Sequence, residues 1–221
     1  MKIGVLGTGT VGQTIGARLV ELGHEVTLGS RTANNQRSAE WATQTGAGAR
    51  AGTFAEASTA GEIVFNCTLG SASVEAVEQA GARNLAGKIL VDVANALDAS
   101  AGMPPRLLRC NDSVAEQIQR ALPETKVVKT LNTMWSGLMV RPRLIDETHH
   151  NFICGDDAGA KAQVRALLAS FGWQPDEIVD LGNLSAARAV EAWLPLCSMI
   201  AGVLGGPFNL KILPVSGSAP S

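Results

Sequence analysis

Short apolar runs alternate along the chain with longer segments in which apolar residues recur at helical spacing. The runs are predicted to be strands and lie at 2–6, 25–28, 49–53, 63–68, 89–93 and 126–131. The predicted helices lie at 11–22, 38–45 and 73–82. Strands that alternate with helices favour an α/β fold with a doubly wound, Rossmann-type, mostly parallel sheet, which binds ligands at the carboxyl ends of its strands.

The second half of the chain is less regular but continues the same alternation. After a loop at 95–110, Asp112 or Ser113 is expected to cap a helix that runs to residue 122, with Glu116 completing a capping box. The later predicted elements are a strand at 151–154, a helix at 158–171, an extended run at 173–179 and a long helix at 184–200. We therefore expect three parts: a Rossmann domain at 1–135, a C-terminal extension on the same sheet at 136–213, and a disordered tail at 214–221.

A glycine-rich turn joins the first predicted strand to the first predicted helix. It has the G-x-G-x-x-G pattern of dinucleotide-binding folds and reads Gly7-Thr8-Gly9-Thr10-Val11-Gly12. The first glycine permits a tight turn, the second lets the main chain approach a pyrophosphate, and the third lets the helix pack closely on the strand. The helix N-terminus offers free N–H groups and a partial positive charge to the phosphates. This context predicts a dinucleotide site rather than a plain glycine-rich turn.

The end of the second predicted strand indicates which dinucleotide binds. A site for NAD usually places a carboxylate there to hold the ribose hydroxyls, whereas this chain reads Gly29-Ser30-Arg31-Thr32. A serine hydroxyl and a guanidinium hydrogen-bond a 2′-phosphate, which a carboxylate would repel. Arg37 could add positive charge from the following helix. These residues predict NADP(H), and the alternative is that Arg31 is only a solvated loop residue.

Composition narrows the class of protein. Of the 221 residues, 46% are hydrophobic and 17% are charged, which is ordinary for a globular protein and wrong for a disordered one. With a net charge of −2 and no basic stripe, nucleic acid is not an expected partner. We see no signal peptide and no uninterrupted membrane-spanning stretch, so a cytoplasmic enzyme without a membrane partner is expected. The four widely spaced cysteines form no C-x-x-C pair and are expected to be buried, reduced thiols.

Several motifs together resemble those of a known enzyme family. They are the opening strand with its glycine loop, Leu-Gly-Ser-Arg at 28–31, Lys-Thr-Leu-Asn-Thr at 129–133, Cys-Gly-Asp-Asp at 154–157, and the segment 180–191 followed by Pro-Leu at 195–196. Through them the chain resembles the coenzyme F420-dependent NADP oxidoreductases and their relatives, which include the reductase domains of STEAP metalloreductases. The likeness covers almost the whole chain, and the segment 180–191 is its most specific part.

The resemblance implies hydride transfer between NADP(H) and a deazaflavin, coenzyme F420, stacked on the nicotinamide. Because both redox partners carry the chemistry and the protein orients them, no catalytic acid, base or nucleophile is expected. By position, Thr8, Ser30 and Arg31 match the family's contacts to the 2′-phosphate, and Thr68 and Leu69 match its contacts under the nicotinamide. The residues that match the lining of the acceptor pocket, which the extension at 136–213 would complete, are Asn132, Thr133, Met134 and Trp135.

The resemblance also suggests a homodimer. The apolar C-terminal helix could supply the contact through Leu194, Leu196, Met199 and Ile200, although the same stripe could pack within one chain.

Three residues near the expected crevice allow two interpretations each. The Trp135 indole either stacks on a flat acceptor or fills the core. Asn95, just past the fifth predicted strand, either contacts the nicotinamide ribose or has no such role. Asp92 is either functional or a strand-end carboxylate hydrogen-bonded to the backbone.

Other charged residues are given structural interpretations. His149 and His150 are interpreted as a solvated loop rather than a metal site, because adjacent residues point apart and no third ligand has suitable spacing. Arg188 and Glu191, three residues apart on a predicted helix, are expected to form an ion pair.

The sequence is therefore compatible with three alternative functions. The first is an NADP(H)-dependent oxidoreductase of the F420-dependent type. The second is an NADPH-dependent reductase of another acceptor, such as a flavin, a quinone or a chelated metal. The third is a redox sensor that binds NADP(H) without turnover.

Overall fold

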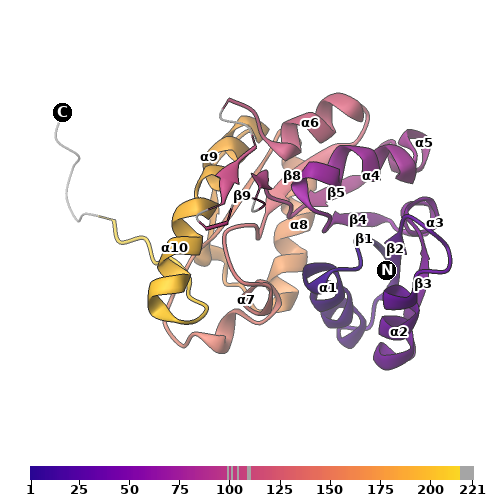
Figure 1. Cartoon of the computed structure of the whole chain (residues 1–221), viewed down its shortest axis with the longest axis horizontal. Helices are drawn as coiled ribbons and strands as arrows, with labels where there is room; N and C mark the ends of the chain where they lie inside the picture. Colours follow the sequence, from indigo (N-terminus) through magenta and orange to yellow (C-terminus); the bar gives the residue numbers. More distant parts are fainter. Residues whose placement is uncertain (99, 101, 104, 109–110, 215–221) are drawn as a thin grey trace.

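One large sheet organises the molecule (Figure 1). The computed structural model describes residues 1–98, 100, 102–103, 105–108 and 111–214. The strand order is β10-β9-β8-β5-β4-β1-β2-β3. All pairs from β3 to β8 are parallel, β9 is antiparallel to β8, and β10 is parallel to β9. The expected doubly wound, mostly parallel α/β fold is thus confirmed.

The elements have the following bounds. The strands of the sheet are β1 Lys2–Leu6, β2 Glu25–Ser30, β3 Ala49–Thr53, β4 Ile63–Asn66, β5 Ile89–Asp92, β8 Lys126–Thr130, β9 Asn151–Gly155 and β10 Ile178–Asp180. A separate hairpin consists of β6 Leu97–Asp98 and β7 Arg106–Leu107. The α-helices are α1 Thr10–Glu21, α2 Gln36–Thr45, α3 Phe54–Ala60, α4 Ser73–Ala80, α5 Ala82–Leu85, α6 Val114–Ala121, α7 Ser136–Val140, α8 Ala158–Phe171, α9 Ala187–Ala192 and α10 Leu194–Leu204. The short 3-10 helices are η1 Gly70–Ala72, η2 Pro142–Leu144, η3 Pro175–Glu177 and η4 Leu184–Ala186.

Helices cover both faces of the sheet, and this explains why its inner strands are mostly apolar. Successive side chains of a strand point to opposite faces. In β4, Ile63 and Phe65 pack in the cluster that contains α1, α2, α7 and α8, whereas Val64 packs in the cluster that contains α3, α4, α5 and α6. A strand that is buried on both faces cannot show polar alternation, so β4 and β5 appear in the sequence as continuous apolar runs.

The C-terminal part differs from the sequence expectation. The long helix expected at 184–200 is divided into η4, α9 and α10, and Pro195 lies in the first turn of α10, where its missing N–H leaves no hydrogen bond unmade. The extended run expected at 173–179 contains the 3-10 turn η3, and only Ile178–Asp180 forms a strand. The predicted disordered tail lies outside the described residues, apart from Pro214.

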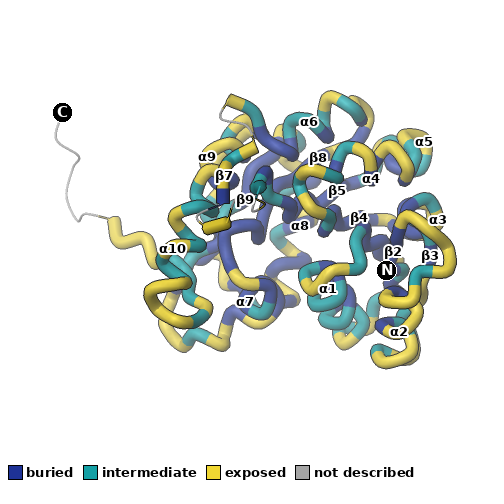
Figure 2. Tube along the Cα trace, viewed as in Figure 1, coloured by how far each residue is buried: buried dark blue, intermediate teal, exposed yellow. Residues whose placement is uncertain are grey.

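The region 184–204 exposes several large apolar side chains, among them Leu196, Met199, Val203 and Leu204. By length and hydropathy alone, Leu184–Leu204 could cross a membrane. Two charged residues, Arg188 and Glu191, lie within this segment. Its last helix, α10, has no buried residue (Figure 2).

Candidate functional site

The glycine loop has the backbone geometry that its sequence pattern requires. It lies at the carboxyl ends of the parallel strands β1, β2, β4, β5 and β8, which we call the carboxyl edge. Gly7 has a φ of 115° and donates from its N–H to Gly29 O at 3.0 Å. A Cβ at Gly12 would lie 2.1 Å from Gly7 O, so only glycine allows α1 to pack this closely. A Cβ at Gly9 would meet nothing within 4 Å, and no side chain caps the N-terminus of α1. The loop is therefore open to a ligand on its outer side.

A pocket of about 280 Å³ adjoins this loop between α1 and α2. Its lining consists of Thr8, Gly9, Thr10, Gln13, Arg37, Glu40, Trp41 and Gln44. Thr8 and Arg37, which the sequence assigned to the cofactor, are thus brought together here, whereas Val11 is half-buried in the first turn of α1. The pocket places a guanidinium beside an open helix N-terminus, which suits an anion.

The turn after β2 separates the roles of Ser30 and Arg31. Ser30 is buried, and its hydroxyl donates to Thr32 O and accepts from Thr32 N at 3.3 Å, so it holds the turn. Arg31 is exposed. Within the described residues, neither Arg31 nor Arg37 forms an ion pair, and both guanidinium groups are free to contact a phosphate.

The loops after β4, β5 and β8 bring the other predicted residues to the same edge. Thr68 donates from its hydroxyl to Asn66 Oδ1 at 2.7 Å, while the neighbouring Leu69 is 79% exposed. Asn95 and Asn132 form a reciprocal pair: Asn132 Nδ2 donates to Asn95 Oδ1 at 2.8 Å, and Asn95 Nδ2 donates to Asn132 O at 3.1 Å. Both polar atoms of the Asn95 side chain are therefore hydrogen-bonded to Asn132, in the segment expected to line the acceptor pocket.

The segment expected to line the acceptor pocket contains both buried and exposed residues. Asn132, Thr133 and Met134 are buried, whereas Trp135 is 52% exposed. The interpretation of Trp135 as a core residue is therefore wrong; its indole lies over Gly137, where a Cβ would come within 2.2 Å of the ring. The hydroxyl of Thr133 is buried and has no hydrogen-bond partner among the described residues, which marks a polar group available to a ligand.

The backbone is strained at the start of this segment. Leu131 has a φ of 63°, and within the described residues it is the one non-glycine residue with a positive φ. Its N–H donates to Asn151 Oδ1 at 3.1 Å, which holds the peptide in this conformation. For a bulky residue such a conformation costs about 1–3 kcal/mol and is typical of functional sites.

Several charged residues behave differently from the sequence expectation. Arg188 does not pair with Glu191; it donates to both carboxylate oxygens of Glu116 on α6, whereas Glu191 is paired with Lys129. The pair expected within one helix instead joins different elements, because Glu191 is held by Lys129 and Val114 N while Arg188 is held by Glu116.

The two neighbouring histidines are not a solvated loop, because His149 is buried. Its Nε2 lies 2.9 Å from Pro142 O, its Nδ1 lies 2.6 Å from Asn209 Nδ2, and its ring meets Trp173 edge-on at 4.9 Å. In the described part of the chain, no group of three acidic, histidine or cysteine side chains could hold a metal ion.

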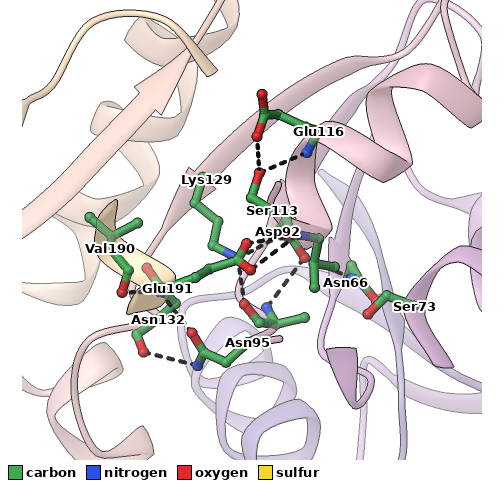
Figure 3. A network of polar contacts seen from close by, with 12 residues as sticks. Asn66, Ser73, Asp92, Asn95, Ser113, Glu116, Lys129, Asn132, Val190 and Glu191 are labelled. Carbon is green, nitrogen blue, oxygen red and sulfur yellow. Dashed lines mark hydrogen bonds and ion pairs between the residues drawn. The ribbon is translucent and has the colours of Figure 1, made fainter. Parts of the chain in front are cut away.

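Sequence reasoning missed a buried network behind the carboxyl edge (Figure 3). Lys129 lies fully buried between the carboxylates of Asp92 and Glu191 at 2.8 Å each. The signal was present, since a lysine that interrupts the apolar run of β8 has to be paired if it is buried. Asp92 serves both as partner of this lysine and as acceptor for Ala94 N at 3.2 Å, so the backbone interpretation was correct but incomplete.

The two cysteines that are buried in the described structure have raised thiol pKa values. Cys67 and Cys154 are free and buried as expected, Cys197 is half-buried, and Cys110 lies outside the described residues. Burial raises the pKa of the Cys67 thiol, and it raises the pKa of Cys154 to about 12. Both therefore remain protonated thiols at neutral pH.

The site can be set beside known proteins. Residues 2–96 match the family described as "NADP oxidoreductase coenzyme F420-dependent". The crystal structure of a candidate F420-dependent NADP-reductase from Arthrobacter sp. FB24 is 46% identical, covers 97% of this chain and 100% of its own, and has a TM-score of 0.91. The chain belongs to the F420-dependent NADP oxidoreductase family. As a member of this family it is an NADP-dependent oxidoreductase.

More distant relatives share only part of their length with this family member. The metalloreductase STEAP3 of Rattus norvegicus is 33% identical over 197 residues, which are 88% of this chain and 36% of that protein. The metalloreductase STEAP2 of Homo sapiens is 28% identical over 89% of this chain and likewise 36% of its own length. The chain thus spans about a third of these relatives.

An imine reductase from Streptomyces aurantiacus shares the fold alone. It is 20% identical, has a TM-score of 0.65, and the similarity covers 93% of this chain and 64% of the reductase.

Proposed function

We propose that this oxidoreductase transfers a hydride between NADP(H) and coenzyme F420, a deazaflavin. The observation that carries the proposal is the half-exposed indole of Trp135 at the carboxyl edge, two residues after Thr133, whose buried hydroxyl has no hydrogen-bond partner among the described residues. A flat tricyclic acceptor can stack on the indole, and the hydroxyl can hydrogen-bond its polar edge. The 46% identity to a candidate F420-dependent NADP-reductase supports the same acceptor.

The residues of the carboxyl edge fit NADP(H). Gly9 leaves space for a pyrophosphate at the open N-terminus of α1. Thr8 and Arg37 line the pocket beside the glycine loop, and Arg31 is exposed in the turn after β2; guanidinium groups at these positions would favour the dianionic 2′-phosphate. Bound NADPH would supply the hydride from its nicotinamide.

The chain's own residues act by orienting and by excluding water. Thr68 and Leu69 on one side, and Trp135 on the other, would hold the two ring systems face to face. Such alignment lowers the barrier because the reacting atoms are already close, and no proton transfer by a side chain is needed. A free acid or base is therefore not required at this edge.

The test is anaerobic NADPH oxidation with one acceptor at a time: F420, FMN or a ferric chelate. We expect turnover with F420. We also expect Trp135→Ala to raise the KM for F420 roughly two- to tenfold, because it loses a stacking partner, while Trp135→Phe retains most of the affinity. The KM for NADPH should stay unchanged in both variants.

The same assay separates the alternatives. Turnover with FMN or the ferric chelate but not with F420 would favour the second function, which the metalloreductase relatives also suggest. Tight NADPH binding without turnover on any acceptor would favour a redox sensor.

We propose further that the chain forms a homodimer through α10. The helix is apolar yet lacks a fully buried residue, and Leu196 and Val203 are 53% and 86% exposed (Figure 2). An apolar surface of this kind is typical of an interface. Sedimentation of the purified chain as a monomer at micromolar concentration would rule the dimer out.

A further inference from the structure

Lys129, on the inner strand β8, has a charged side chain that is fully buried. Its ammonium lies 2.8 Å from Asp92 Oδ2 and 2.8 Å from Glu191 Oε1, and it also donates to Ala94 O (Figure 3). Burial lowers the pKa of Lys129, but the two carboxylates outweigh burial and leave the pKa above its ordinary value. An ammonium with three buried acceptors stays in place, because any displacement leaves a buried charge unpaired.

One branch of this network reaches the loop after β4. Asn66 Nδ2 donates to Asp92 Oδ1 at 2.7 Å, and Asn66 Oδ1 accepts from the hydroxyl and the N–H of Thr68 at 2.7 and 3.3 Å. The Thr68 hydroxyl also lies 2.9 Å from Ser73 Oγ at the start of α4. Asp92 therefore sets the position of Thr68, the residue expected under the nicotinamide.

A second branch reaches the segment after β8. Glu191 accepts from Val114 N with both oxygens, at 3.1 and 3.0 Å, so α9 is fastened to the N-terminus of α6. The adjacent carbonyl, Val190 O, accepts from Asn132 Nδ2 at 3.1 Å. The same Asn132 amide holds Asn95, and the strained turn at Leu131 directs it there.

Stability alone does not explain a charge at this position. Apolar side chains of similar volume often stabilise a core as well as a buried ion pair does. An apolar side chain at position 129 would fill the space in β8, but it would make no directed bond to either neighbouring segment.

We propose that Lys129 is a positioning residue for hydride transfer. Through Asp92 and Glu191, its ammonium holds the loop after β4 and the segment after β8 at a fixed separation on the nicotinamide side of the carboxyl edge. The inference rests on the proposed binding of NADP(H) at this edge. Hydride transfer requires near-contact alignment, so a small shift of either loop lowers kcat while the adenosine half still binds.

The test compares Lys129→Met with Lys126→Met, a matched substitution on the same strand. Lys126 pairs with Asp157 at the surface, 3.0 Å away. Two ligands are titrated by calorimetry: NADPH and 2′,5′-ADP, which carries the 2′-phosphate but no nicotinamide. For Lys129→Met we expect unchanged affinity for 2′,5′-ADP and a kcat for NADPH oxidation that falls roughly ten- to a hundredfold, with little change in the KM for NADPH. Lys126→Met should match the wild type in its affinity for 2′,5′-ADP, its kcat and its KM for NADPH.

A second variant keeps the test decisive if Lys129→Met does not fold. Asn66→Ala removes the link from Asp92 to Thr68 and leaves both ion pairs of Lys129 intact, so it should show the same loss of kcat. Wild-type kcat in either folded variant overturns the proposal. An equal loss of 2′,5′-ADP binding also overturns it, because that result means general damage.

A failure of the positioning role of Lys129 can be distinguished from a failure of the proposed oxidoreductase function. If the wild type binds NADPH but oxidises it with no acceptor, the proposed function fails. The positioning role is then judged by the fluorescence of bound NADPH, which reports how the nicotinamide is held. Emission that shifts toward that of free NADPH in Lys129→Met supports the role, and unchanged emission overturns it.

Discussion

A methyl group at Gly12 would lie 2.1 Å from Gly7 O, whereas one at Gly9 would meet nothing within 4 Å. The same motif thus contains one glycine that packing requires and one that leaves room for a molecule outside the fold. Ser30 and Arg31 differ in a comparable way. The Ser30 hydroxyl is used within its own turn, while the Arg31 side chain extends into solvent.

Arg31 is the residue on which the choice of NADP(H) can be tested. We expect Arg31→Ala to weaken NADPH binding by on the order of 1.5–3 kcal/mol, roughly 10- to 150-fold, and to change NADH binding little, because only NADPH carries the 2′-phosphate. Fluorescence titration with each nucleotide measures both constants. Arg50→Ala is a suitable control, since Arg50 is also exposed but pairs with Glu25. Equal loss for the two nucleotides would show that Arg31 does not recognise the 2′-phosphate.

At the scale of elements, the length of α8 and of α3 explains why the first was predicted from the sequence and the second was missed. The bounds of α8 were predicted correctly, because its 14 residues give a clear apolar period between a cap at Asp157 and a stop at Gly172. The seven-residue α3 was missed, although Thr53 and Glu56 form a complete capping box at its start. In so short a helix the period covers only two turns, and the cap is the main signal.

The cap should therefore contribute measurably to stability. We expect Thr53→Ala to lower the free energy of unfolding by about 1 kcal/mol, because the N–H of Glu56 loses its acceptor. Thr59→Ala in the same helix is the control; its hydroxyl bonds only to Ala55 O within the helix and should matter less. Urea unfolding measures both changes. Similar losses in the two variants would contradict a specific role of the cap.

At the scale of the whole molecule, the C-terminal extension is fastened to the sheet by groups from different elements. β9 pairs with β8, Glu191 reaches Lys129 inside the sheet, and Arg188 reaches Glu116 on α6. The segment after α10 is held as well, because Asn209 donates to His150 O at 3.0 Å. Contacts of this kind join parts of the chain that are distant in sequence, so they depend on the complete fold.

The Glu116–Arg188 pair makes part of this fastening dependent on pH. The hydrogen bond from Arg188 is the largest influence on the Glu116 carboxyl and holds its pKa below the ordinary value of 4.5. A carboxyl group whose pKa is lowered by folding contributes stability above its unfolded pKa and loses it as the pH falls through the folded pKa. Wild type should therefore exceed Glu116→Gln in urea stability at neutral pH, and the difference should shrink below about pH 4.5. If the difference in stability between wild type and Glu116→Gln persists in acid, it arises from packing and not from the charge of Glu116.

The sequence by itself determined the features whose physics is local. The glycine loop, the Ser30-Arg31 turn and the alternation of strands and helices each depend on a few adjacent residues, and they sufficed to predict the fold class and a dinucleotide site. They also placed Trp135 after a strand, but left open whether its indole was buried.

Only the tertiary structure decided which distant residues meet. Lys129 lies 37 positions from Asp92 and 62 from Glu191, so no local pattern could pair them, and the local rule instead paired Arg188 with Glu191. The exposure of Trp135 and the burial of His149 were likewise set by elements from elsewhere in the chain. The physical reason is that an ion pair or a buried surface requires two partners in contact, and the fold of the whole sheet determines which partners those are.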